Sequence, residues 1–183
     1  MSDNSDKYRR AVNGFSAVVV TVPNNAWSGA SPCDAWTAKD VVGHVIIGMQ
    51  RVAGRGPEGG PTGSSLAPDD DPVDSYVVAR DAAFAALTTD NLAKTASGPM
   101  GEMPLDELVG TLATMDVLIH TWDLAQAAGM AVTLDEELVE EAYDRLLPVD
   151  AMIRTSGVFG PKLEPPVGAD LQTKLMCFTG RRA

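Results

Sequence analysis

The stretch LDELVGTLATMDVLIHTWDLAQAA, residues 105–128, carries the pattern that decides the fold. Its apolar residues recur at steps of three and four, which is the spacing of one face of an α-helix. Pro104 precedes the stretch, and proline is favoured in the first turn of a helix, while Gly129 follows it in the position of a C-terminal cap. We therefore predict a long helix that begins after Pro104 and ends at Ala128.

Polar side chains interrupt the inward face of this predicted helix. The face comprises Leu105, Val109, Leu112, Asp116, Ile119, His120, Asp123 and Ala127. Asp116 and His120 are four residues apart, so their side chains lie one above the other and can reach one ion. A buried carboxylate without a partner costs several kcal/mol or becomes neutral. A metal ion would be such a partner.

The sequence contains two histidines, and the other one lies on a second predicted helix. We expect that helix to run from about Ala38 to Ala53, with Thr37 and Asp40 forming a capping box at its start. His44 falls on its inner face, and two helices packed about 8–10 Å apart can bring such side chains together. Two imidazole nitrogens and one carboxylate suit Zn, Fe, Ni or Mn, and leave positions for water or substrate.

A structural role for the same polar residues is the alternative. A lone histidine on an apolar face is commonly a satisfied core residue, and Asp116 and His120 can hydrogen-bond one another. Asp123 has two interpretations, either a carboxylate that orients His120 or a partner of a surface cation or neighbouring helix. These alternatives stay open at the level of residue spacing.

The rest of the chain supplies enough helices for a bundle. We predict helices over about 6–22, 73–87 and 135–153, a short one over 170–179, and an irregular connection with some extended character over 91–103. Residues 54–72 are rich in Gly and Pro and predict a mobile surface loop. The expected architecture is all-α: one four-helix-bundle domain over 1–183, with an additional C-terminal helical segment from about 154.

Composition excludes several classes of function. The net charge is −11 and the pI is near 4.4, so the surface repels phosphate backbones and anionic lipids. No apolar run approaches the roughly 20 residues of a membrane span. We expect no nucleic-acid or membrane partner and a cytoplasmic protein, in which Cys33 and Cys177 are reduced thiols. Cys33, Trp36 and Trp122 are interpreted as packing residues.

Two motifs resemble one family. PCDAWTAKDVVGH, residues 32–44, is similar to the second-helix signature of actinobacterial DinB-like proteins related to the mycothiol-dependent maleylpyruvate isomerase. DVLIHTWDLA, residues 116–125, resembles the helix-four signature of the same group, as does the ending LMCFTGRR, residues 175–182. The resemblance implies a DinB-like four-helix bundle that holds a divalent metal, often zinc or nickel. It implies His44 and His120 as ligands, with Asp116 where the family often has Glu or His.

The resemblance also implies a thiol-dependent activity, namely an isomerase or transferase that uses mycothiol and an electrophilic substrate, and it suggests a homodimer. The characterised isomerase has a C-terminal domain with a catalytic arginine. We expect this chain to be too short to match that domain in full, and Arg154, Arg181 and Arg182 are not assigned to the role. A non-catalytic metal- or ligand-binding module is the alternative, and a purely structural polar cluster is a third hypothesis.

Overall fold

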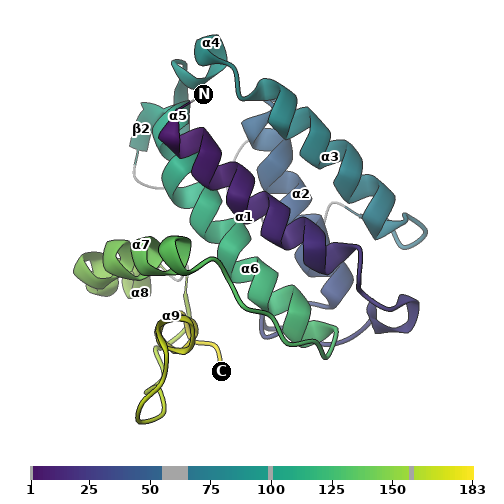
Figure 1. Cartoon of the computed structure of the whole chain (residues 1–183), viewed down its shortest axis with the longest axis vertical. Coiled ribbons are helices and arrows are strands. Elements are labelled where there is room, and N and C mark those ends of the chain that lie inside the picture. Colours follow the sequence, from purple (N-terminus) through teal and green to yellow (C-terminus); the bar gives the residue numbers. More distant parts are fainter. Residues whose placement is uncertain (1, 55–65, 99–100, 157–158) are drawn as a thin grey trace. The chain divides into compact units, whose positions relative to one another are not determined.

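The computed structural model describes residues 2–54, 66–98, 101–156 and 159–183, and Figure 1 shows the chain. The expected all-α class is confirmed. The chain divides into two compact units, Met1–Val132 and Thr133–Ala183. The single domain over 1–183, with an extension from about 154, stays a prediction. No helix among the described residues is both long and apolar enough to cross a membrane.

The first unit is built on the predicted four-helix bundle. Its long helices are α1 (Asp3–Val19), α2 (Ala38–Val52), α3 (Pro72–Ala86) and α6 (Thr114–Ala127). Figure 1 shows these helices running alongside one another, and α1 and α2 both contact α6. Their buried faces include Tyr8, Val12, Phe15, Val41, Val45, Met49, Tyr76 and Leu124. The bundle thus brings the middle of α2 next to the middle of α6.

Side-chain caps fix where these helices begin. The predicted capping box of α2 is confirmed, because the hydroxyl of Thr37 accepts from the backbone of Asp40, whose carboxylate accepts from the backbone of Thr37. The first helix begins earlier than predicted, because Ser2 caps it, and it ends at Val19 rather than at 22. Asp71 caps α3 through the backbone amides of residues 73 and 74. The capping box places His44 in the second turn of α2.

The prediction of one uninterrupted helix over 105–128 is wrong. A short helix, α5 (Leu105–Leu108), is followed by a π-helical turn over Val109–Ala113 and then by α6. The hydroxyl of Thr114 donates to the carbonyl of Val109, and the side chain of Asn4 occupies the space where a Cβ on Gly110 would lie. α6 itself is a regular α-helix, so the predicted spacing of Asp116, His120 and Asp123 on one side of it is kept.

The connection between α3 and α5 is more regular than predicted. It contains the short helix α4 (Thr89–Leu92) and an antiparallel hairpin of β1 (Thr95–Gly98) and β2 (Gly101–Pro104), in which Thr95 pairs with Pro104. A 3₁₀ turn, η1 (Asn24–Ala26), follows α1. Most of the loop predicted over 54–72 lies outside the described residues.

The second unit contains α7 (Glu136–Leu146), α8 (Asp150–Ser156) and α9 (Leu171–Phe178). The helix predicted over 135–153 is interrupted by a 3₁₀ turn over Leu147–Val149, since Pro148 has no backbone N–H for a continuing helix. α7 packs on α9, with the Tyr143 and Phe178 rings 5.8 Å apart. Arg154 donates to Asp150 and to the carbonyls of Gly160 and Phe178, so it stabilises this unit.

Candidate metal centre

The bundle brings together the three predicted ligand residues. Nε2 of His44, from α2, lies 3.3 Å from Oδ1 of Asp116, on α6. Nε2 of His120, one turn further along α6, lies 3.5 Å from the same oxygen. One ligand atom from each of the three residues lies within 4.8 Å of the other two. The arrangement follows from the i, i+4 spacing on α6 and from the packing of α2 against that helix.

Access to the site is one-sided. His44 and His120 are buried, at 6% and 7% exposure, whereas the side chain of Asp116 is 38% exposed. The Trp36 ring lies 4.8 Å from the His44 ring and 5.8 Å from the His120 ring, and it stacks on the latter at 29°. Trp36 therefore covers both imidazoles, as a packing residue of the site itself, while the Asp116 carboxylate keeps contact with solvent.

Charges within the cluster are strongly coupled. Burial opposes ionisation of Asp116, but the charge of His120 and hydrogen bonds from both histidines outweigh it and hold the pKa of this carboxyl well below its usual range. Burial likewise opposes protonation of His120, yet the charge of Asp116 and hydrogen bonds with Asp116, Asp123 and Cys33 raise the pKa of His120 well above 6.5. The two opposite pKa shifts have one cause, because the negative charge of Asp116 and the positive charge of a protonated His120 stabilise each other. Burial, together with Tyr76 and Asp116, also raises the pKa of Tyr8.

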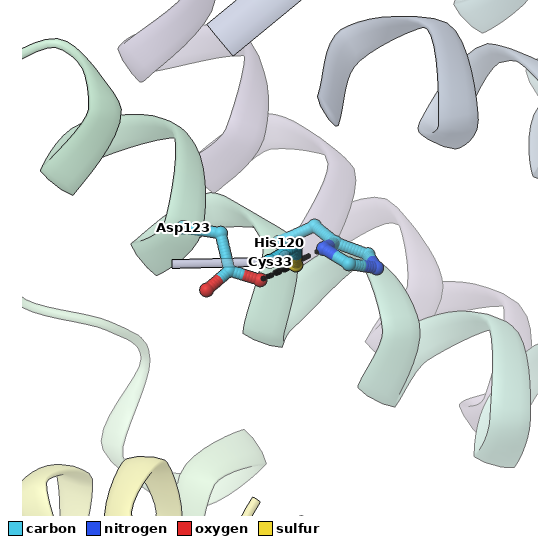
Figure 2. A group of neighbouring side chains, drawn as sticks. All are labelled: Cys33, His120 and Asp123. Carbon is cyan, nitrogen blue, oxygen red and sulfur yellow. Dashed lines mark hydrogen bonds and ion pairs between the residues drawn. The ribbon is translucent and has the colours of Figure 1, made fainter. Parts of the chain in front are cut away.

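The far nitrogen of His120 has its own carboxylate. Nδ1 of His120 lies 2.9 Å from Oδ2 of Asp123, which is fully buried. Of the two sequence interpretations of Asp123, the geometry matches the one in which it orients His120, because a hydrogen-bonded Nδ1 leaves Nε2 to face Asp116 and His44. The thiol of Cys33 donates to the same Oδ2 at 3.3 Å. Figure 2 shows Cys33, His120 and Asp123 pointing toward one another.

Sequence reasoning missed the role of the loop that precedes α2. Cys33 was expected to pack as a small apolar residue, but it contacts a carboxylate 90 residues away in the sequence. The loop is ordered by an isolated bridge between Ala30 and Thr37 and by a hydrogen bond from the amide of Ser31 to the carbonyl of Trp36. Ala35 has a φ of 63°, which is costly for a residue with a Cβ. That strained turn lies between Cys33, which contacts Asp123, and Trp36, which contacts both histidines.

The residues fit a divalent transition metal. Two imidazole nitrogens and one carboxylate oxygen form the donor set, and the opposite nitrogen of one imidazole is held by a buried carboxylate, as is usual for metal-binding histidines. Nδ1 of His44 is buried and has no hydrogen-bond partner among the described residues. His44 is therefore held by packing against Trp36 and by its contact with Asp116, and this leaves its Nε2 directed at the shared centre.

The fold and the site together describe a helical-bundle protein with a candidate metal centre, formed by a His–Asp–His cluster between two of its helices. Residues 8–125 match the model of the family described as the mycothiol maleylpyruvate isomerase N-terminal domain. The chain belongs to this family. The matched segment begins in α1 and ends in α6, so it includes all three residues of the cluster.

Relatives and a solved structure agree with this membership. Uncharacterized proteins from two strains of Mycobacterium tuberculosis are 33% identical to the chain over 164 residues, covering 87% of it and 81% of each relative. The crystal structure of a histidine-to-alanine mutant of the mycothiol-dependent maleylpyruvate isomerase matches with a TM-score of 0.55 at 16% identity, covering 91% of this chain and 77% of that one. At this identity the match establishes the shared helical fold.

Proposed function

We propose that the protein binds one divalent metal ion, zinc or nickel, through His44, Asp116 and His120, and that it catalyses a mycothiol-dependent transfer or isomerisation of an electrophilic small molecule. The convergence of the three ligand atoms within 4.8 Å carries the proposal. Family membership supports the choice of thiol, since the family is described by mycothiol and by an isomerase reaction.

Each residue of the centre has a distinct task in this proposal. His44 and His120 would hold the metal through the ring nitrogens that face Asp116, and Asp116 would add a negative charge that favours binding of a cation. A bound divalent metal lowers the pKa of a thiol ligand, so that the thiolate is the form present at neutral pH. Asp123 holds the proton on Nδ1 of His120 and so keeps that imidazole in the tautomer whose Nε2 can donate a lone pair.

The described residues around the His–Asp–His cluster leave it open to a thiol from the side of Asp116 only. Trp36 shields both imidazoles from water, which strengthens electrostatic interactions at the centre. The 38% exposure of the Asp116 side chain marks the side from which a thiol and its substrate would approach. The low pKa of Asp116 keeps it a carboxylate throughout the neutral range, so we assign it to metal binding and not to proton delivery.

The test is a thiol-dependent assay of the metal-loaded protein. Protein loaded with zinc or nickel is incubated with mycothiol and maleylpyruvate, and separately with mycothiol and a simple alkylating electrophile. We expect either isomerisation with the thiol returned unchanged or consumption of the free thiol, and loss of both in His44→Ala. Metal-free protein and His44→Ala serve as controls, and circular dichroism verifies that the variant is folded.

Two results would overturn the proposal in different ways. Metal binding without any thiol-dependent reaction or thiol binding would favour the non-catalytic metal-binding module. A reaction that is equally fast in metal-free protein and in His44→Ala would remove the metal from the account.

A further inference from the structure

The carboxylate of Asp123 receives two donors on a single oxygen. Nδ1 of His120 lies 2.9 Å from Oδ2, and Sγ of Cys33 lies 3.3 Å from the same atom. Asp123 is fully buried, so solvent does not compensate for a donor that is lost. Removing a partner from a buried charged group costs more than the hydrogen bond itself is worth. The direction of this carboxylate therefore depends on both donors.

The loop carries the thiol to this position with little freedom. The Ser31 hydroxyl accepts from the amide of Cys33 at 3.0 Å, and the amide of Trp36 donates to the carbonyl of Cys33 at 3.1 Å. The backbone around Cys33 is thus tied on both sides. The strained residue Ala35 belongs to the same turn, and a costly backbone conformation persists only where the surroundings hold it.

We propose that Cys33 is a positioning residue for His120: its thiol, as a neutral donor, fixes the carboxylate of Asp123, and Asp123 in turn fixes the Nδ1–H tautomer of His120 and the direction of Nε2. The inference rests on the proposed function, because Nε2 is the atom assigned to the metal. It gives the loop before α2 a part in the centre, although none of its residues belongs to the His44–Asp116–His120 cluster.

A different role for the thiol would be direct metal binding. One ligand atom each from Cys33, His120 and Asp123 lies within 4.8 Å of the others, so these residues could in principle hold an ion of their own. The geometry favours positioning, since Oδ2 of Asp123 is already the acceptor for both other groups. Metal binding there would need to displace the protons from the thiol and from Nδ1 at a carboxylate that solvent does not reach.

The experiment compares Cys33→Ala, which removes the donor, with Cys33→Ser, which keeps an O–H donor. Cys177→Ala is the control, because Cys177 is the second cysteine of the chain and lies buried in the other unit. Each protein is titrated with cobalt(II), whose visible absorption reports ligand type and geometry. Outer-shell partners of metal ligands typically contribute about 10–100-fold in affinity. Cys33 acts through another residue, so we expect about tenfold weaker binding and an altered spectrum in Cys33→Ala.

Rescue distinguishes positioning from packing. Cys33→Ser should restore most of the affinity and the spectrum, and Cys177→Ala should match the wild type in both. Unchanged affinity and spectrum in Cys33→Ala would overturn the proposal. An intense thiolate-to-cobalt charge-transfer band in the wild type that disappears in Cys33→Ala would also overturn it, by making the thiol a ligand.

The proposed function can fail independently. If wild-type protein binds no cobalt, zinc or nickel, the metal assignment is wrong, whereas Cys33 can still be tested in metal-free protein. Nitrogen-15 NMR of the imidazoles then reports how fast the Nδ1 proton of His120 exchanges with water. Faster exchange in Cys33→Ala than in Cys33→Ser would uphold the positioning role, and equal exchange would refute it.

Discussion

Two carboxylates of α6 contact the same imidazole from opposite ends. Asp116, four residues before His120, faces Nε2 and exposes 38% of its side chain, whereas Asp123, three residues after it, faces Nδ1 and is fully buried. Asp116 also contacts His44 on another helix, while Asp123 contacts Cys33 on a loop. One helix thus presents chemically identical groups in two opposite environments.

Burial, and not residue type, separates the metal-binding role proposed for Asp116 from the positioning role proposed for Asp123. A carboxylate that is partly exposed can exchange bound water for a metal ion, because its surroundings can rearrange. At a buried carboxylate with fixed donors, metal binding would cost the hydrogen bonds that the carboxylate accepts. Such a carboxylate therefore serves to hold its neighbour in place. Substitutions of Asp116 and of Asp123 remove the interaction at Nε2 and the interaction at Nδ1 of His120 separately.

Removal of the Asp116 carboxylate should have the largest effect on metal binding. Asp116→Ala deletes a proposed direct ligand, so the loss of affinity should exceed the roughly 10–100-fold typical of outer-shell partners. The fold should tolerate the change, since the side chain is half-exposed. Isothermal titration calorimetry with zinc measures the affinity. The control is Asp81→Ala, which removes an exposed carboxylate on α3. Retention of wild-type affinity in Asp116→Ala would show that Asp116 is not a metal ligand.

Asp123→Asn should affect stability and metal binding together. The amide cannot carry the charge that balances its donors, so we expect a loss of about 1–3 kcal/mol in the free energy of unfolding. Metal affinity should fall by about 10–100-fold. Urea unfolding of metal-free protein measures the first quantity, and zinc titration measures the second. If Asp123→Asn lost zinc affinity but kept the free energy of unfolding of the wild type, Asp123 would not be a carboxylate that stabilises the metal-free fold.

Metal binding should release a proton and weaken as the pH falls. The pKa of His120 is raised well above 6.5 in the metal-free protein, so a metal must displace a proton at any pH below that raised pKa. The same shift stabilises the metal-free fold fully below about 6.5 and is lost as the pH rises through the raised pKa. Calorimetry in buffers of different ionisation enthalpy counts the protons. Binding without proton release near pH 7 would contradict the coupled pair.

A methyl group next to Asp116 should have the smallest effect. A Cβ on Gly48 would lie 3.9 Å from Oδ2 of Asp116, which is ordinary contact, so Gly48→Ala should fold and bind metal normally. Replacing glycine within a helix should stabilise the protein by about 0.5–1 kcal/mol. Gly14→Ala in α1, where a Cβ meets nothing, is the matched control. Weaker mycothiol binding in Gly48→Ala alone would place the thiol beside Asp116.

Helical periodicity predicted the part of the centre that lies on helices. His44, Asp116 and His120 were placed on inward faces, and the capping box of Thr37 fixes the start of α2, so their spacing indicated that these side chains could meet, and the family resemblance implied the same residues. The π-helical turn before α6 was not predicted, because steps of three and four residues between the apolar positions were interpreted as one continuous α-helix.

The part of the centre on the loop was not predictable from spacing. Cys33 and Trp36 reach the histidines through a turn at Ala35 with positive φ, and no local pattern indicates such a conformation for alanine. The contact between Cys33 and Asp123 also joins residues 90 positions apart in the sequence. Contacts between a loop and a distant helix depend on the tertiary fold.

The most direct test of the central claim is the metal content of protein purified without a histidine tag or chelator, measured by mass spectrometry and compared with His44→Ala. We expect about one equivalent of a transition metal in the wild type, with zinc or nickel as the main species, and its loss in His44→Ala. No metal in the wild type, even after incubation with zinc, nickel and manganese, would contradict the account and return the His–Asp–His cluster to a structural role.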